Sequence, residues 1–405
     1  MFRWLPIFLM CLLVPVALVP ADDLGEKLNK AAQQWFDRQA APDNVERTIA
    51  PLALDAEPHT VQTADGWMLV VHRYRSHGRP QPSMPIILCH GFGYNALFWD
   101  LEPSCSFAEY LARRGYDVWS VNLRGCGLSQ KWVWQVESAP TLLTGSALRN
   151  LSHGKLALTG YATIDPKYAN WNLDDHIAFD VPAVINLVRQ HTGAKQVAWV
   201  GHSMGGIAAL CCLEKFPNPG IGKLITVGSQ VTMPQGQLLN QFAIEMIKTR
   251  ELQFAGQLNN KERMLAVQTS LQNIFFNERN VSPSVYHALC SWASDVPSIG
   301  LLQQYASLSN GGDLLDHKGQ YDYSQHLANI KIPMLVSCGE ADQIAPPAVQ
   351  KYLYDRLGSF DKSLVIFGRS GGFAVNSGHN DAIVGLTSMA QVYPVLERWL
   401  RTGKP

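Results

Sequence analysis

The sequence has no excess of charge of either sign. Its 33 basic residues balance 33 acidic residues, so the formal net charge is zero, and neither sign forms a long run. Such a sequence offers no basic, aromatic-interleaved patch of the kind that binds nucleic acid. The same neutrality argues against electrostatic recruitment to anionic lipid. We therefore expect no nucleic-acid partner, and at most transient contact with lipid interfaces.

The sequence also lacks an apolar run long enough to span a bilayer comfortably. The run at the N-terminus extends from Leu5 to Val19 and contains two prolines, whereas a membrane-spanning helix needs about 20 apolar residues. A basic residue before the run, Arg3, and short side chains around Ala21 are typical of a cleaved secretory signal. We therefore expect residues 1–21 to be a signal peptide and the mature protein to be secreted or periplasmic. An uncleaved membrane anchor is the alternative.

Cysteine is sparse and has no metal-ligand spacing. Of the eight cysteines in 405 residues, Cys11 lies in the predicted signal, and none of the other seven is spaced as in zinc sites. We therefore expect no metal and no cofactor. An odd number leaves at least one thiol free or paired between chains, and Cys105 with Cys126 is the pair that we consider for a disulfide.

A serine stands at the junction of a predicted strand and a predicted helix. Residues 197–200 are apolar, Gly201-x-Ser203-x-Gly205 follows, and an apolar helical stretch continues from there. This context is typical of a nucleophile elbow, in which a sharp turn raises the serine hydroxyl above the sheet. Side chains at Gly201 or Gly205 would collide with neighbouring backbone. We predict that Ser203 is a nucleophile.

Two later strand ends supply an acid and a base in the chain order that such a nucleophile requires. Residues 333–339 are an apolar run followed by Glu340-Ala-Asp342, and residues 363–368 form another run, after which His379 stands in a glycine-rich loop. Loops at the carboxyl ends of parallel strands carry functional side chains. We predict Asp342 as the acid, with Glu340 as the alternative, and His379 as the base.

The His-Gly-Phe-Gly loop at residues 90–93 follows an earlier apolar strand. In elbow enzymes, one oxyanion donor is the N–H of the residue after the nucleophile, and another comes from such a loop. The predicted donors are therefore the N–H groups of Met204 and Phe92, with Gly91 as the alternative to Phe92. We expect the side chain of His90 to make a structural hydrogen bond rather than to take part in the reaction.

Strands alternate with helices over most of the chain. A helix is predicted over 174–191 and ends at a C-cap glycine, Gly193. The strand-like runs lie at 86–89, 118–123, 197–200 and 224–227, after a hairpin between residues 59 and 75 that turns at Asp65-Gly66. Such alternation predicts an α/β fold with a parallel sheet covered by helices on both faces.

Several short sequences resemble the acid lipase family, the gastric and lysosomal lipases, within the α/β-hydrolase superfamily. They run in order from about residue 60 to 400 and lie at 65–69, 88–91, 116–125, 180–183, 201–205, 321–324, 330–333, 339–342 and 378–381. The resemblance implies an α/β-hydrolase fold with an inserted, mainly helical cap, and a serine ester hydrolase with Ser203, Asp342 and His379 as its triad. Met204 stands where the acid lipases usually carry glutamine, so the resemblance does not specify triglyceride as the substrate.

Residues 231–330 interrupt the alternation of strands and helices and are expected to form the cap. The segment is rich in Gln, Asn and interleaved apolar residues, and it precedes the strand that leads to Asp342. The predicted substrate-binding residues in it are Met233, Phe242, Met246 and Trp292, with Phe275 and Phe276 as further candidates. The expected division is a signal peptide at 1–21, a helical extension and linker at 22–58, a core at 59–230 and 331–405, and the cap at 231–330.

Together these features predict a secreted, lipase-like or carboxylesterase-like enzyme that cleaves small-molecule or lipid acyl esters through an acyl-enzyme. The same triad would serve a thioester or lactone hydrolase or an acyltransferase, which are the alternatives within the fold. The non-enzyme alternative is a secreted binding protein on an inactive hydrolase scaffold. An aspartate nucleophile is disfavoured because a serine fills that position.

Overall fold

The computed structural model describes residues 56–77, 80–81, 83–130, 134–136, 157–158, 162–164, 170–232, 274–295, 297–298, 300–305 and 312–405. The predicted signal peptide and N-terminal helix lie outside these residues. The chain forms two compact units, one of residues 1–48 and 131–171, the other of residues 49–130 and 172–405. In the described part of the first unit, β5 (Trp134–Val136), β7 (Ala162–Ile164) and β6 (Ala157–Leu158) form a small antiparallel sheet in that order.

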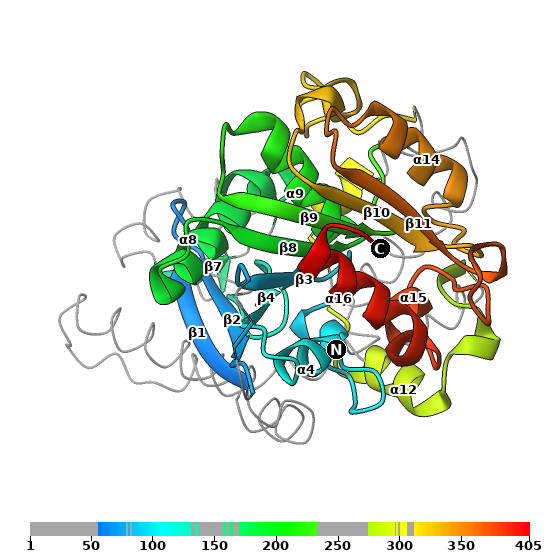
Figure 1. Ribbon diagram of the computed structural model, residues 1–405. Coiled ribbons are helices and arrows are strands. Elements are labelled where there is room, and N and C mark those ends of the chain that lie inside the picture. Colours follow the sequence, from blue (N-terminus) through cyan, green and yellow to red (C-terminus); the bar gives the residue numbers. More distant parts are fainter. Residues whose placement is uncertain are drawn as a thin grey trace, which may run out of the picture. The chain divides into compact units, whose positions relative to one another are not determined.

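The second unit is built on an eight-stranded sheet in the order β1-β2-β4-β3-β8-β9-β10-β11 (Figure 1). The pairs β1/β2 and β2/β4 are antiparallel, and the other five pairs are parallel. The strands are β1 (Ala56–Gln62), β2 (Met68–Tyr74), β3 (Ile86–Cys89), β4 (Val118–Asn122), β8 (Val197–His202), β9 (Ile221–Val227), β10 (Met334–Gly339) and β11 (Lys362–Phe367). The predicted α/β architecture is therefore confirmed, and so is the hairpin that turns at Gly66.

The central strands are apolar along their whole length because both faces of the sheet are covered. Every residue of β3, β4 and β8 is buried. Alternate side chains enter separate cores: Ile87 and Trp199 belong to one cluster, and Leu88 and Val200 to the other. This is why these strands read in the sequence as continuous apolar runs rather than as alternating ones.

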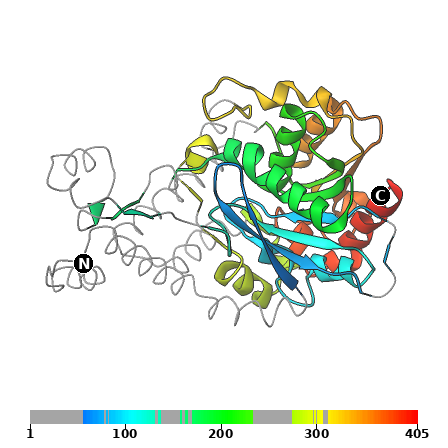
Figure 2. The same cartoon turned by 90° about the vertical axis from the view of Figure 1, so that its left-hand side faces the viewer.

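The helices divide between the two faces of the sheet (Figures 1 and 2). Residues of α8 (Val181–Thr192), α9 (Met204–Lys215) and α14 (Pro347–Arg356) belong to the first core cluster. Those of α4 (Phe107–Ala112), α12 (Pro283–Ser291), α15 (Asp381–Val384) and α16 (Tyr393–Thr402) belong to the second. Further short helical turns are η1 (Ala96–Trp99), η4 (Glu278–Asn280), η5 (Tyr323–Gln325), η6 (Leu327–Asn329), η7 (Arg369–Gly371) and η8 (Ser388–Val392).

The helix predicted over 174–191 consists of three parts. A short α7 (Leu173–Asp175) begins at a capping box made by Asn172 and leads into a π-helical turn, η3 (His176–Asp180), which continues as α8. Gly193 ends α8 in the left-handed conformation at φ 71°, as predicted. The predicted helix is therefore confirmed, and the π turn within it is the feature that apolar spacing does not reveal.

The seven cysteines from Cys89 to Cys338 are all buried thiols. The disulfide considered between Cys105 and Cys126 is therefore not formed. Among the helices of the described residues, none combines the length and the apolar character needed to cross a membrane.

Glu214, near the end of α9, has a buried carboxyl group. Both carboxyl oxygens lack a hydrogen-bond partner within the described residues. Burial, reinforced by the nearby Asp322, raises the pKa of Glu214 to about 9. The folded protein therefore holds this group protonated at neutral pH, whereas the unfolded chain releases the proton above its ordinary pKa of 4.5.

We predict that Glu214→Gln makes the protein more stable at alkaline pH. The raised pKa means that the folded state binds one more proton than the unfolded state between about pH 4.5 and pH 9, so wild-type stability falls across this window as pH rises. The amide has no proton to lose, so the variant should match the wild type at pH 4.5 and exceed it by several kcal/mol, up to about 5, at pH 8. Urea unfolding at both pH values measures the difference. Glu278→Gln, at an exposed position, should show none.

Candidate functional site

Ser203 forms the tight turn between β8 and α9. Its backbone has φ 50° and ψ −119°, a conformation that a residue with a side chain adopts only when its surroundings hold it. The Ser203 N–H donates to Val227 O at 2.8 Å. The Ser203 carbonyl accepts from the N–H groups of Gly206 and Ile207 and from Ser229 Oγ at 2.8 Å. The turn is therefore fixed by the end of β9, by Ser229 after it and by the first turn of α9.

The two glycines of the Gly-x-Ser-x-Gly motif allow this turn to pack. A Cβ atom at Gly201 would lie 2.2 Å from Gly206 N, and one at Gly205 would lie 2.4 Å from Cys89 O. Both distances are far below any contact that real Cβ atoms make. The collisions predicted from the sequence are confirmed, and they show that α9 starts directly against the end of β3.

Asp342 and His379 meet at the carboxyl edge of the sheet. Asp342 lies in the loop after β10 and His379 in the loop after β11, and His379 Nδ1 is 2.9 Å from Asp342 Oδ2. The N–H groups of Ile344 and Ala345 donate to Asp342 Oδ1 at 2.9 and 2.8 Å. The carboxylate is therefore oriented by its own loop, with one oxygen left for the imidazole.

Glu340, the alternative acid, faces a different loop. Its Oε2 accepts from the N–H of Ser370 at 3.0 Å, and a Cβ at Gly368 would lie 2.0 Å from the same oxygen. The structure thus brings Asp342, and not Glu340, to His379.

The serine turn is tied to the histidine loop through His202. His202 Nε2 lies 3.0 Å from His379 O, so the ring donates to this carbonyl, and the two rings are 4.8 Å apart. Phe98 stacks on the other side of the His202 ring at 4.5 Å. Burial, and then the charge of His379, keep the pKa of His202 well below its ordinary value, so the ring stays neutral. Ser203 Oγ and His379 Nε2 share no hydrogen bond in this structure, and such a contact often tightens only with substrate.

A glycine at the end of β9 leaves space for the Asp–His pair. Gly228 has φ 63°, and a Cβ there would lie 3.0 Å from both Asp342 Oδ2 and His379 Nδ1. No role was predicted for this residue. Its signal was the position of a glycine directly after a buried parallel strand.

The loop after β3 lies against the serine turn. A Cβ at Gly91 would be 3.1 Å from Ser203 Cβ, so the loop that carries Phe92 reaches the predicted nucleophile. Met204 is the first residue of α9, where a backbone N–H has no acceptor within the helix. The Phe92 ring packs against Tyr305, with centroids 4.8 Å apart. Both predicted oxyanion donors are therefore next to Ser203 along the chain or in space.

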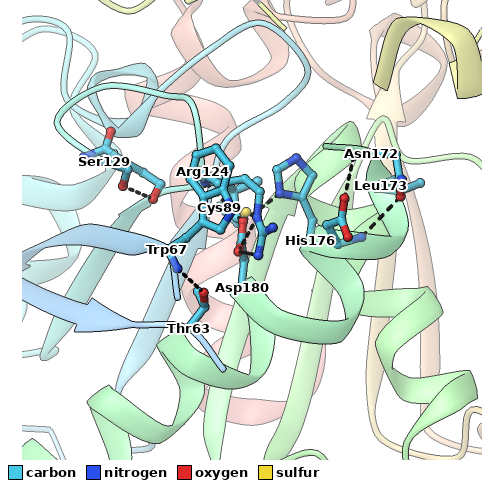
Figure 3. A network of polar contacts seen from close by, with 12 residues as sticks. Thr63, Trp67, Cys89, Arg124, Ser129, Asn172, Leu173, His176 and Asp180 are labelled. Atoms are coloured by element: carbon cyan, nitrogen blue, oxygen red, sulfur yellow. Dashed lines mark hydrogen bonds and ion pairs between the residues drawn. The ribbon is translucent and has the colours of Figure 1, made fainter. Parts of the chain in front are cut away.

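A buried charge network lies beside this loop (Figure 3). Arg124, which is 1% exposed, follows β4 and pairs with Asp180 Oδ1 at 2.7 Å and with Asp65 Oδ2 at 2.8 Å. His176 Nδ1 lies 2.8 Å from Asp180 Oδ2. Burial alone would raise the pKa of Asp180, but Arg124 and the hydrogen bond from His176 outweigh it, and the pKa is lowered. Arg124 and Asp180 lie in sequences that resemble the acid lipases, yet no role was predicted for them.

Asp381 binds a segment of the predicted cap to the His379 loop. Its Oδ1 accepts from the N–H groups of Gly378 and Asn277 at 2.9 and 3.0 Å, and its Oδ2 accepts from Asn280 Nδ2 at 2.8 Å. Asn380 N–H donates to Phe275 O, and the Phe275 ring lies 6.2 Å from that of His379.

The predicted pocket residues are only partly described. Met233, Phe242 and Met246 lie outside the described residues. Trp292 is half-buried directly after α12, its ring is 6.2 Å from that of His287, and its carbonyl accepts from Asn95 Nδ2 at 3.0 Å. The described contacts therefore join the Trp292 backbone to the loop after β3, while Phe275 is the candidate that they bring to His379.

The buried thiols of the described residues are poorly suited to form a reactive thiolate. Burial raises the pKa of the Cys89, Cys211 and Cys338 thiols, which disfavours a reactive thiolate. Within the same part of the chain, no three His, Cys, Asp or Glu side chains converge as a metal site would require.

Comparison with known proteins places the chain among hydrolases. A family model described as alpha/beta hydrolase fold matches residues 84–385. Human lipase member K is 30% identical over 189 residues, which cover 45% of this chain and 40% of that protein. The gastric triacylglycerol lipase of Bos taurus is 29% identical over 180 residues, 43% of this chain and 38% of that one. The matches therefore span less than half of each relative's length.

A solved structure shares the fold. An esterase from Thermogutta terrifontis aligns with 86% of this chain and 100% of its own, with a TM-score of 0.54 at 16% identity.

We predict that Gly228→Ala disrupts the Asp342–His379 hydrogen bond, because the added methyl group competes for the space of both side chains. A displacement of this kind lowers a reaction that depends on His379 by about 10²-fold. The low-field proton resonance of His379 Nδ1 should be lost or shifted. Gly193→Ala is the matched control: Gly193 has φ 71° with nothing within 4 Å of an added Cβ. An unchanged resonance in Gly228→Ala would contradict the assignment.

We also predict that Arg124→Met lowers the free energy of unfolding by roughly 3–5 kcal/mol, because it leaves Asp180 as a buried charge without its cation. Urea unfolding measures the loss. Arg75→Met removes an ion pair of the same type with Glu57 at an exposed position and should leave the midpoint nearly unchanged. Equal effects of the two substitutions would refute the role given to the buried network.

Proposed function

Because the chain belongs to the alpha/beta hydrolase family, related to lipases and esterases, we propose that it is a secreted serine ester hydrolase. Ser203 is the nucleophile, His379 the general base and Asp342 the acid that orients it. The observation that carries this proposal is the Asp342–His379 pair at 2.9 Å beside a Ser203 turn with φ 50°. A scaffold that only bound a ligand would not need this buried pair or the strained turn.

The reaction begins when His379 Nε2 takes the proton of Ser203 as Oγ attacks the ester carbonyl carbon. Asp342 holds Nδ1–H of His379, which fixes the tautomer and stabilises the imidazolium. The carbonyl oxygen becomes an oxyanion that accepts hydrogen bonds from the Phe92 and Met204 N–H groups. His379 then protonates the leaving alcohol oxygen, and the acyl group remains on Ser203.

Water completes the cycle. His379 removes a proton from water as its oxygen attacks the acyl carbon, and the same N–H groups bind the second oxyanion. Collapse releases the carboxylic acid and returns the proton to Ser203. Each oxyanion donor contributes roughly 2.7–4 kcal/mol to transition-state stabilisation.

Residues 231–330 serve as the cap in this proposal, and the acyl chain lies beneath them. The clamp between Asp381 and Asn280 and the 6.2 Å approach of Phe275 to His379 support an apolar wall above the site. The names of the relatives, lipase member K and gastric triacylglycerol lipase, favour a lipid ester. The N-terminal apolar run supports secretion.

The test is hydrolysis of p-nitrophenyl esters from acetate to palmitate by the purified mature protein. Ser203→Ala should lose turnover by roughly 10⁴-fold or more without loss of stability. Ser120→Ala is the control, because it removes another buried hydroxyl, which lies within β4 and donates to Ala96 O at 3.0 Å. A rate maximum at medium or long chains would support a lipid ester, and a maximum at acetate a small ester.

A wild-type rate in Ser203→Ala would refute the nucleophile. The absence of any Ser203-dependent rate across the series would refute ester hydrolysis and favour the thioester, lactone or acyl-transfer alternatives, which use the same triad.

A further inference from the structure

His90 is a completely buried histidine between β3 and the loop that carries Phe92. Its exposed fraction is 0%. Its Nδ1 lies 2.9 Å from Gly91 O, and the Leu123 N–H donates to its Nε2 at 3.3 Å. Both ring nitrogens are thus engaged by backbone groups, and neither faces the reacting atoms.

These two partners permit a single tautomer. A backbone N–H can only donate, so Nε2 must accept, and a carbonyl can only accept, so Nδ1 must carry the proton. Burial lowers the pKa of His90 to about 4, so the ring is neutral at neutral pH. His90 is therefore a fixed hydrogen-bond donor directed at one carbonyl oxygen.

That carbonyl belongs to the peptide unit that also contains the Phe92 N–H. In a trans peptide the C=O and N–H point in opposite directions, and none of the described peptide bonds is cis. The Tyr94 N–H also donates to Gly91 O, at 3.3 Å. With the carbonyl held toward His90 and Tyr94, the Phe92 N–H must point the other way.

We infer that His90 is a positioning residue that locks the Gly91–Phe92 peptide, so that the Phe92 N–H meets the oxyanion formed at Ser203. The inference rests on the proposed function. Glycine at position 91 is required by the close approach to His202 and Ser203, because a Cβ there would lie 2.7 Å from His202 Nδ1 and 3.1 Å from Ser203 Cβ, but glycine also lets a peptide rotate. A rotated peptide would leave Nδ1–H of His90 without an acceptor in a buried site, which is unfavourable. The hydrogen bond from His90 to Gly91 O therefore offsets the rotational freedom that glycine at position 91 gives to the peptide.

The buried charge network holds the other side of the His90 ring. The N–H of Arg124 donates to Asp180 Oδ2 at 3.1 Å, which fixes the peptide next to the Leu123 N–H. Figure 3 shows Cys89, the residue before His90, beside Arg124 and Asp180. The ion pair is thus linked to the oxyanion peptide through the backbone of Leu123 and Arg124 and the two hydrogen bonds of the His90 ring.

Two amide substitutions separate the two hydrogen bonds of His90. In His90→Asn, Nδ2 can occupy the place of Nδ1 and donate to Gly91 O. In His90→Gln, Oε1 can accept from the Leu123 N–H near the place of Nε2, but no donor remains for Gly91 O. We expect His90→Gln to lower kcat by roughly 10²–10³-fold with KM little changed, the effect of losing one oxyanion donor. His90→Asn should keep kcat within about tenfold of wild type.

His72→Gln is the matched control for the loss of a buried neutral histidine. His72 is 5% exposed on β2, and burial lowers its pKa to about 4 as well. It should reproduce any loss of stability in His90→Gln but not the loss of kcat. Thermal unfolding of all three variants accompanies the kinetics.

Crystal structures of the wild type, His90→Asn and His90→Gln show the orientation of the Gly91–Phe92 peptide and do not depend on enzymatic activity. The Gly91 carbonyl should point toward residue 90 in the first two and be rotated in His90→Gln. An unrotated peptide or a wild-type kcat in His90→Gln would overturn the inference, and so would equal losses of kcat in both variants. If the wild type hydrolysed no ester, the proposed function would fail, while the carbonyl orientation would still decide the role of His90.

Discussion

The backbone at Ser203 is bent into a conformation that a serine rarely adopts, and the candidate site is arranged around that bend. Hydrogen bonds from β9 and from Ser229 hold the turn. The turn leaves no room for a side chain at Gly201 or Gly205. It also lies so close to the loop after β3 that a Cβ placed on Gly91 would be 3.1 Å from Ser203 Cβ. One strained turn thus sets the place of the hydroxyl, the start of α9 and the distance to the oxyanion loop.

Around this turn, hydrogen bonds and a buried ion pair hold polar side chains in fixed orientations. His202 and His90 are kept neutral by burial, and each ring donates to the backbone of a loop that carries a candidate catalytic group. Arg124 and Asp180 pair beneath the oxyanion loop. Dipoles fixed in this way need little reorganisation when charge develops on a substrate, which is how preorganised sites stabilise a transition state.

Much of this arrangement could be predicted from local signals in the sequence. Buried parallel strands read as short apolar runs, and Ser203, Asp342 and His379 each follow one of them. Parallel strands share a carboxyl edge, so residues far apart in the sequence could be expected to meet there. The Gly-x-Ser-x-Gly spacing between an apolar strand and an apolar helix predicted the turn, because a turn this tight has no room for a side chain at either glycine.

What the sequence did not reveal depends on contacts between distant segments. The need for glycine at position 228 becomes evident only once His379 packs against it, and His202 gains its role from its hydrogen bond to the carbonyl of His379. The π turn at His176–Asp180 has no periodic signature of its own. The cap was predicted from composition, and three of its four predicted pocket residues lie outside the described residues.

The most direct test of the account is reaction of the purified protein with diethyl p-nitrophenyl phosphate, followed by peptide mass spectrometry. The phosphoryl group is an electrophile that a serine activated by the Asp342–His379 pair attacks irreversibly. We expect one equivalent of p-nitrophenol to be released per chain, with the phosphoryl adduct on Ser203 and much slower labelling in His379→Ala. Failure to react, or an adduct on another residue, would contradict the assignment of Ser203 as the activated nucleophile.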